Sequence, residues 1–254
     1  MKLNGMIVVY ALLCTVTLGA RAQSRIIAHR GYWKCEGSAQ NSITSLQKAA
    51  EVGIYGSEFD VQLTKDRNVV VNHDDSINGM MIGDVTYGDL KNIRLKNGEK
   101  LSLLDDYLKV GKTLPGIQLI LEIKPHRTEA EENDATDIVV RKVKEMNMEK
   151  QVEYISFSMN ICERLVKLTP ESEIAYLNGD ISPENLKDKG INGIDYHVKI
   201  LAERPEWIEE AHRLGMKVNV WTVDKMEQIS QMNNLKVDFI TTNYPVKAKN
   251  LVAR

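Results

Sequence analysis

The chain has 254 residues, of which 43% are hydrophobic and 27% charged, and its formal net charge is −2 at pH 7. This near balance of basic and acidic residues gives no indication of binding to nucleic acid or to an anionic membrane. Length and composition are those of an ordinary globular protein and suit one large α/β domain.

The first 22 residues are predicted to be a signal peptide. Lys2 supplies a positive charge, residues 6–18 are apolar, and Ala20-Arg21-Ala22 fits a cleavage site. The apolar run is too short for a membrane-spanning helix, which needs ~20 residues. We therefore expect an exported protein, periplasmic or secreted, whose mature domain spans residues 23–254 and has no stable membrane insertion.

Strand and helix patterns alternate along the rest of the chain. Strands are predicted at residues 26–28, 56–61, 69–72, 117–124, 152–158, 173–177, 193–197, 217–223 and 237–241. Helices are predicted at residues 41–51, 102–110, 129–146, 161–168, 205–214 and 225–233, with a short one after Ser182-Pro183. Ser102 to Asp105 resembles a capping box, and the residues from Asp89 to that point are expected to be loop.

These nine strands predict a TIM-type (β/α)8 barrel with a β-hairpin extension. Residues 64–68 leave too little chain for a parallel crossover, which needs a dozen or more residues. Residues 69–72 must therefore return antiparallel to the second strand, and eight strands remain for the barrel. Cys35 and Cys162 follow strands on opposite sides of this barrel, so we expect two free thiols.

Charged residues gather where the predicted barrel strands end, which is where TIM barrels carry their active sites. His29 and Arg30 follow the first strand, and the hairpin would bring His73 back to the same mouth. Glu58 and Asp60 lie on one face of the second strand, since side chains alternate along a strand. Glu122 and Lys124 repeat that spacing on a later strand.

These residue types point to phosphodiester chemistry. Adjacent carboxylates repel each other unless they share a proton or a cation, and a hard divalent cation prefers oxygen ligands. Histidines exchange protons near neutral pH, and the planar guanidinium of Arg30 suits a phosphate. Together they describe a metal-assisted site that cleaves phosphodiesters.

The ordered set of motifs resembles the glycerophosphodiester phosphodiesterase family from about Ile26 to the C-terminus. The motifs are His29-Arg30-Gly31, Glu58-Phe59-Asp60-Val61, His73-Asp74, Lys100 to Asp106, Glu122-Ile123-Lys124 and Val220-Trp221-Thr222-Val223. One position departs from the family pattern, because Gln40 stands where the family usually has a Glu, while Asn41 is retained. The family's fold is the same TIM barrel.

The resemblance implies a site and a reaction. Glu58, Asp60 and Glu122 would bind Ca²⁺ or Mg²⁺, and a small-molecule glycerophosphodiester would be cleaved to glycerol 3-phosphate and an alcohol. His29 and His73 would be the catalytic acid and base, in an order that the sequence does not assign. The substrate would be bound by Arg30, Lys124 and Trp221.

Other interpretations of the same residues remain open. The carboxylates could form ion pairs with Arg30 and Lys124, and Trp221 could pack in the barrel. A metal-dependent amidohydrolase would need a second histidine where Gly31 stands. A phosphatidylinositol phospholipase C-like enzyme shares the two-histidine chemistry, and a non-catalytic glycerophosphodiester-binding barrel is the alternative outside enzymes.

Overall fold

Eight parallel strands close into a barrel, as the sequence predicts. The computed structural model describes residues 23–253, so the predicted signal peptide lies outside the described residues. The strands of the ring are β1 Arg25–Ala28, β2 Gly56–Leu63, β6 Gln118–Ile123, β7 Val152–Ser156, β8 Ile174–Tyr176, β9 Gly193–His197, β10 Lys217–Trp221 and β11 Phe239–Thr242. The ring is closed because β1 pairs with both β11 and β2.

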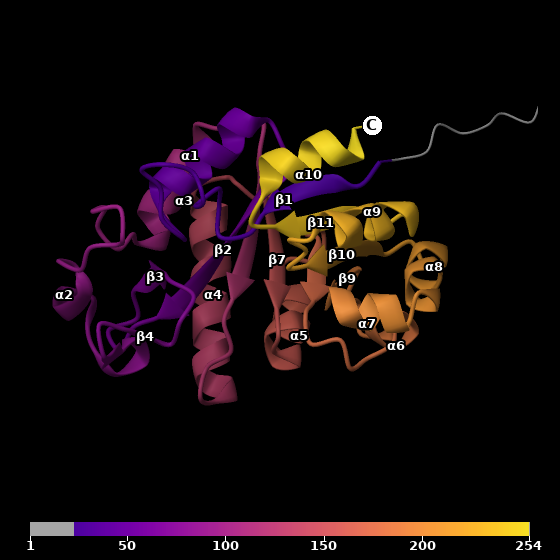
Figure 1. Cartoon of the computed structure of the whole chain (residues 1–254). Coiled ribbons are helices and arrows are strands. Elements are labelled where there is room, and N and C mark those ends of the chain that lie inside the picture. Colours follow the sequence, from indigo (N-terminus) through magenta and orange to yellow (C-terminus); the bar gives the residue numbers. More distant parts are fainter. Residues whose placement is uncertain (1–22, 254) are drawn as a thin grey trace, which may run out of the picture.

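Helices surround the ring on its outer side (Figure 1). They are α1 Ile43–Val52, α3 Leu104–Lys112, α4 Glu129–Glu145, α5 Met159–Leu168, α6 Pro183–Asp188, α7 Val198–Glu203, α8 Glu206–Arg213, α9 Met226–Asn234 and α10 Pro245–Val252. Alternation along the strands divides the side chains between two layers. On β2, Phe59 stacks on Tyr107 of α3 in the outer core, whereas Glu58 and Asp60 belong to the opposite face of the strand.

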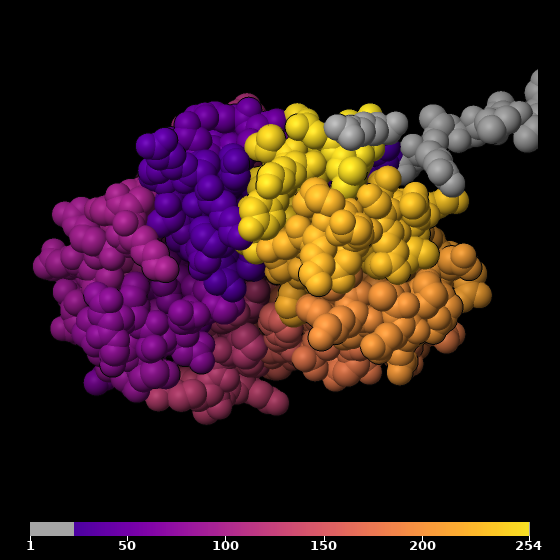
Figure 2. All heavy atoms as spheres, viewed as in Figure 1, coloured from indigo at the N-terminus to yellow at the C-terminus, as the bar shows by residue number. Residues whose placement is uncertain are grey.

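A segment of about forty residues extends from the end of β2. Strand β3, Val69–Val71, runs antiparallel to β2 and places Val71 opposite Val61, which confirms the predicted hairpin. The extension continues through β4 Ser76–Ile77, β5 Met80–Met81, a 3-10 turn Ile82–Asp84 and α2 Tyr87–Leu90. The extension, coloured purple to magenta in Figure 2, covers one side of the molecule.

The extension has its own small core, made by Val70, Ile82, Leu90, Ile93 and Leu101. This core orders residues that the sequence analysis assigned to loop. Its members are spread over thirty residues without a regular period, which is why periodicity did not reveal them.

Several local predictions were incomplete or wrong. Helices α7 and α10 were not predicted, and α3 does not begin with a capping box. The N-cap of α3 is Leu103, and no side chain caps it. Ser102 is instead buried beside β3, where its carbonyl oxygen accepts a hydrogen bond from the backbone N–H of Val71. Cys35 and Cys162 are free thiols, as predicted.

Between residues 23 and 253, no helix is both long enough and apolar enough to cross a bilayer.

Candidate active site

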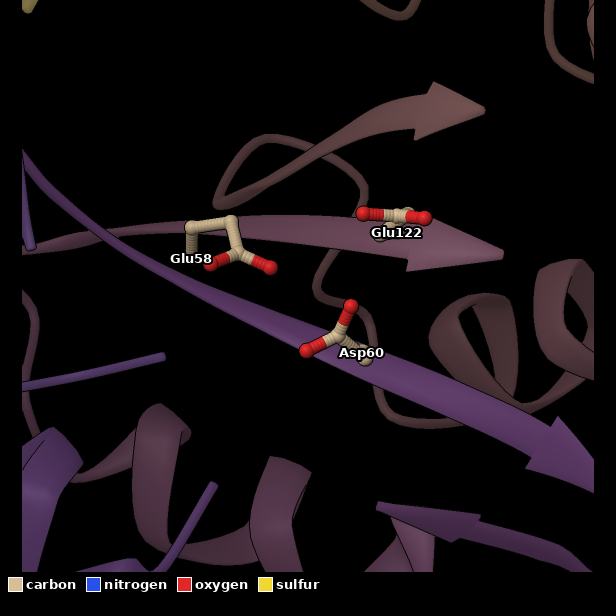
Figure 3. A group of neighbouring side chains, drawn as sticks. All are labelled: Glu58, Asp60 and Glu122. Carbon is tan, nitrogen blue, oxygen red and sulfur yellow. The ribbon is translucent and has the colours of Figure 1, made fainter. Parts of the chain in front are cut away.

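Three carboxylates converge at the mouth of the barrel. Glu58 and Asp60 project from β2, and Glu122 projects toward them from the neighbouring strand β6 (Figure 3). The parallel register places Asp60 directly beside Glu122. One oxygen from each residue lies within 4.8 Å of the other two. The structure therefore brings together all three residues that the sequence analysis selected as metal ligands.

The carboxylates are buried, and burial makes their negative charges costly. Their exposed fractions are 4% for Glu58, 1% for Asp60 and 7% for Glu122. Burial raises the pKa of Glu58 well above its usual range, and the charges of Asp60 and Glu122 raise it further. Burial, followed by repulsion from Asp60, raises the pKa of Glu122 to about 8. The group therefore favours a shared proton or a bound cation.

A divalent cation fits this donor set. Among the residues that the structure describes, Oδ1 of Asp60 has no hydrogen-bond partner although it is buried. Its nearest cation is Lys124 Nζ, 3.6 Å away, which is longer than a hydrogen bond. An all-oxygen donor set is the type that Ca²⁺ and Mg²⁺ prefer, whereas zinc sites usually include nitrogen or sulfur.

Two basic side chains border the carboxylates. Lys124 Nζ lies 2.8 Å from Glu122 Oε1, and Arg30 Nε lies 3.8 Å from Asp60 Oδ2. Burial acts to lower the pKa of Lys124, but the carboxylates of Glu122 and Asp60 raise it overall. Both cations are held close enough to reach an anion bound over the carboxylates.

The turn after β1 shapes one wall of the site. Arg30 and Gly31 both adopt left-handed backbone angles, with φ of 54° and 75°. A Cβ on Gly31 would lie 2.3 Å from Ser45 Oγ, so only glycine fits between the turn and α1. The turn aims the backbone N–H of Arg30 at Glu58 Oε2, 2.7 Å away. The positive φ of Gly31 and its close approach to Ser45 explain why a glycine follows His29-Arg30.

His29 stands beside the carboxylates with its two ring nitrogens in different surroundings. Nε2 lies 4.0 Å from Glu58 Oε2, and Nδ1 lies 2.9 Å from Asn243 Oδ1. Burial, with a smaller contribution from the charge of Arg30, lowers the pKa of His29 to about 4. In the absence of bound ligands the imidazole is therefore neutral at physiological pH.

His73 lies at the same mouth but is more exposed. It follows β3, whose last hydrogen bond to β2 joins Asn72 N–H to the Asp60 carbonyl. Its ring Nδ1 lies 2.7 Å from Asp74 Oδ1, and its carbonyl accepts a hydrogen bond from Gln62. That contact with His73 lowers the pKa of Asp74. The hairpin thus brings His73 close enough to His29 for its charge to lower the pKa of His29.

Trp221 is the last residue of β10. Its indole N–H donates to the Asp195 carbonyl, and its ring packs edge-on against Phe157 and His197. Phe157 in turn lies 5.8 Å from the ammonium of Lys124. Trp221 is half-buried, and Phe157 links it to the Lys124 side of the site.

The two residues that follow Ala39 take different positions. Gln40 is exposed, and its Oε1 accepts a hydrogen bond from Arg30 Nη1, 2.9 Å away. Asn41 is buried and binds Asp60 through both its amide nitrogen and its amide oxygen. Asn41, rather than residue 40, therefore sets the orientation of a carboxylate in the cluster.

Three residues at this site were not selected by the sequence analysis. Asn243 contacts His29, and both Asp224 and Trp33 contact Asn243. Asn243 directly follows β11, and Asp224 lies three residues after β10. The rule that polar residues at barrel strand ends belong to the mouth could have found both. Trp33 has no comparable signal, because its role depends on a contact with a residue 210 positions away.

Comparisons with known proteins agree on one family. The model of the Glycerophosphoryl diester phosphodiesterase family matches residues 29–247. A solved glycerophosphodiester phosphodiesterase from Parabacteroides distasonis is 48% identical, covers 92% of this chain and 98% of its own, and superposes with a TM-score of 0.91. A glycerophosphodiester phosphodiesterase from Caldanaerobacter subterraneus subsp. tengcongensis is 28% identical over 90% of this chain and 98% of its own length.

A third protein shares the fold at lower identity. An Oleispira antarctica phosphodiesterase, solved with its product sn-glycerol-3-phosphate, is 23% identical and has a TM-score of 0.78. The match covers 91% of this chain and 98% of that one.

Proposed function

The chain belongs to the glycerophosphoryl diester phosphodiesterase family and is a phosphodiesterase, and from this premise we propose a specific reaction. It cleaves glycerophosphodiesters to glycerol 3-phosphate and an alcohol, with a divalent cation and two histidines. One observation carries the proposal: three buried carboxylates converge beside His29 and within reach of Arg30 and Lys124. The product bound in the Oleispira antarctica structure supports this substrate class.

Glu58, Asp60 and Glu122 would hold the cation, either Ca²⁺ or Mg²⁺. Two observations support this assignment: the raised pKa values of Glu58 and Glu122, and the buried Oδ1 of Asp60, which has no hydrogen-bond partner among the described residues. When bound, the cation offsets the repulsion among the carboxylates and polarises a phosphoryl oxygen of the substrate.

The remaining residues act directly on the substrate. Arg30 and Lys124 orient the phosphoryl group and stabilise the charge that develops on its oxygens. His29 and His73 supply a proton acceptor and a proton donor on the two sides of the scissile bond. Trp221, with Phe157, forms a wall against the apolar edge of the glycerol or alcohol group.

Metal removal tests the cation. Protein stripped with EDTA should release no glycerol 3-phosphate from glycerophosphocholine or glycerophosphoethanolamine, and Ca²⁺ or Mg²⁺ should restore the reaction. Full turnover in a sample shown by elemental analysis to be metal-free would contradict the proposal. Cleavage of phosphatidylinositol but of no glycerophosphodiester would favour the phospholipase C-like alternative.

Histidine variants test the acid–base pair. His29→Ala and His73→Ala should each lower kcat/KM by ~10² to 10⁴-fold, the usual contribution of one general acid or base. His212→Ala is the matched control, because His212 also contacts a carboxylate, Asp238, but lies outside the proposed site. The proposal fails if both site variants retain the wild-type rate.

We also propose export, since residues 1–22 have the pattern of a cleavable signal peptide. Exported protein should begin at or near Gln23. N-terminal sequencing that finds Met1 or Lys2 on the exported protein would exclude cleavage at this site.

A further inference from the structure

Asn243 touches His29 and is itself held by two other side chains. Its Oδ1 lies 2.9 Å from His29 Nδ1 and 2.8 Å from the indole nitrogen of Trp33. Its Nδ2 lies 2.8 Å from Asp224 Oδ2. Asp224 also accepts hydrogen bonds from the backbone N–H of Asn243 and the hydroxyl of Thr242, so its carboxylate is firmly placed.

Chemistry alone decides which way the Asn243 amide faces. The oxygen and nitrogen of an amide are distinguished by their partners. The indole nitrogen of Trp33 can only donate, so the amide atom beside it must be the oxygen. The ionised carboxylate of Asp224 can only accept, so the atom beside it must be the nitrogen. Reversing the amide would set donor against donor at Trp33 and acceptor against acceptor at Asp224.

This orientation determines the tautomer of His29. Because Asn243 presents an oxygen, Nδ1 of His29 must carry a proton. A neutral imidazole has one N–H only, so Nε2 then holds the lone pair. That nitrogen is the one that faces Glu58 and the carboxylate cluster.

We propose that Asn243, Asp224 and Trp33 are positioning residues that hold His29 with a proton on Nδ1, so that Nε2 is the nitrogen that exchanges a proton in the reaction. The inference rests on the proposed function, because it assigns the reacting nitrogen of a histidine in that reaction. A neutral amide orients the ring without adding a fourth negative charge beside three carboxylates.

The tautomer itself is the first test. Protein labelled with ¹⁵N in its histidine rings should be studied by NMR at a pH where His29 is neutral, with the signals assigned through single His→Gln variants. We expect His29 to show a protonated Nδ1 and an unprotonated Nε2. A neutral His29 protonated on Nε2 would overturn the inference, whatever the activity of the enzyme.

Kinetics of Asn243→Ala are the second test. Loss of the acceptor should lower kcat by about 10- to 100-fold, the usual effect of removing a partner that orients a functional histidine, with KM changed by less than about twofold. The matched control is Asn185→Ala, at an exposed position on α6, which should leave kcat unchanged. Wild-type kcat in folded Asn243→Ala would overturn the inference.

A variant in which the side chains of Asn243 and Asp224 are exchanged provides a second test, which applies even if Asn243→Ala does not fold. In the double variant Asp224→Asn/Asn243→Asp, the new carboxylate accepts from Trp33 and His29, and the new amide donates to it. This variant should recover kcat to within about tenfold of wild type and restore the Nδ1-protonated signal. If the double variant folds but recovers neither kcat nor the Nδ1-protonated signal, the inference is overturned.

Failure of the proposed function gives a different result. Wild-type protein without activity on any glycerophosphodiester would contradict the substrate assignment, and the NMR measurement would still decide the tautomer.

Discussion

The two ends of the barrel both contain buried acidic groups, but they treat them differently. At the mouth, Glu58, Asp60 and Glu122 converge within 4.8 Å of one another. At the floor, a cavity of about 240 Å³ is lined by Glu153, Glu173 and Asp195 among other residues. Among the described residues, it is the mouth acids that bring three ligand atoms together. The comparison teaches that convergence, rather than burial of charge, distinguishes the candidate active site.

Glu153 and Asp195 of the floor differ in what surrounds their carboxyl groups. Glu153 accepts a hydrogen bond from the hydroxyl of Tyr55. Burial raises the pKa of Asp195 to about 7, so that it is largely protonated below neutral pH. The guanidinium carbon of Arg25 lies 4.0 Å from the ring centroid of Tyr55 and 4.4 Å from that of Phe239, and these two rings stack on each other. The floor therefore has the features of a structural layer, whereas the mouth can bind a cation.

The largest effect should come from the same substitution made at both ends. Asp60→Asn removes a carboxylate that would hold the cation, and such electrostatic contributions amount to several kcal/mol. We expect kcat to fall by at least ~10³-fold in Asp60→Asn. Asp195→Asn should retain wild-type kcat, because its side chain touches neither substrate nor cation in the proposed site. A steady-state assay with glycerophosphocholine measures both.

Thermal unfolding supplies the control for that pair. Ca²⁺ or Mg²⁺ should raise the melting temperature of wild type and of Asp195→Asn, since a ligand that binds only the folded state stabilises it. The same ions should have little effect on Asp60→Asn. Equal stabilisation of all three proteins would place the cation elsewhere.

A smaller effect should appear in the pH dependence of stability at the floor. The pKa of Asp195 is raised from 3.8 to about 7 on folding, so the folded state binds more protons in that interval. Stability should therefore fall as pH rises through the interval and level off above it. Asp195→Asn is neutral throughout and should lose this fall. Between pH 5 and pH 8, the free energy of unfolding of Asp195→Asn should rise by roughly 2 to 3 kcal/mol relative to that of wild type.

Guanidinium unfolding of wild type and Asp195→Asn at the two pH values tests this prediction. Parallel pH profiles for the two proteins would mean that Asp195 is ionised without cost, and the contrast between mouth and floor would lose its basis.

The smallest effect should come from the edge of the mouth cluster. Gln40 is exposed and contacts Arg30 rather than the three carboxylates. Gln40→Glu keeps an acceptor for Arg30 and adds an exposed ion pair, which contributes ~0 to 1 kcal/mol. We expect kcat/KM to change by less than about fivefold. A large increase in cation affinity, measured by calorimetry, would instead show that residue 40 faces the ion.

Much of the barrel could be predicted because its strands are short, regular and separated by enough chain for crossovers. The short link of residues 64–68 was enough to require the antiparallel hairpin, and β3 confirms it. Alternation along β2 placed Glu58 and Asp60 on one face, and strand direction placed Glu122 at the same end. These are local regularities of backbone geometry, so a single sequence expresses them.

Only the tertiary structure determined how the side chains meet. The link from His29 through Asn243 to Asp224 joins residues about 200 positions apart, and its polarity depends on which partners can only donate or only accept. The small core of the extension and the positions of the floor acids are likewise set by packing. The sequence by itself determined the barrel and the residue types at its mouth. The position of each proton and each free oxygen depends on contacts that local periodicity does not encode.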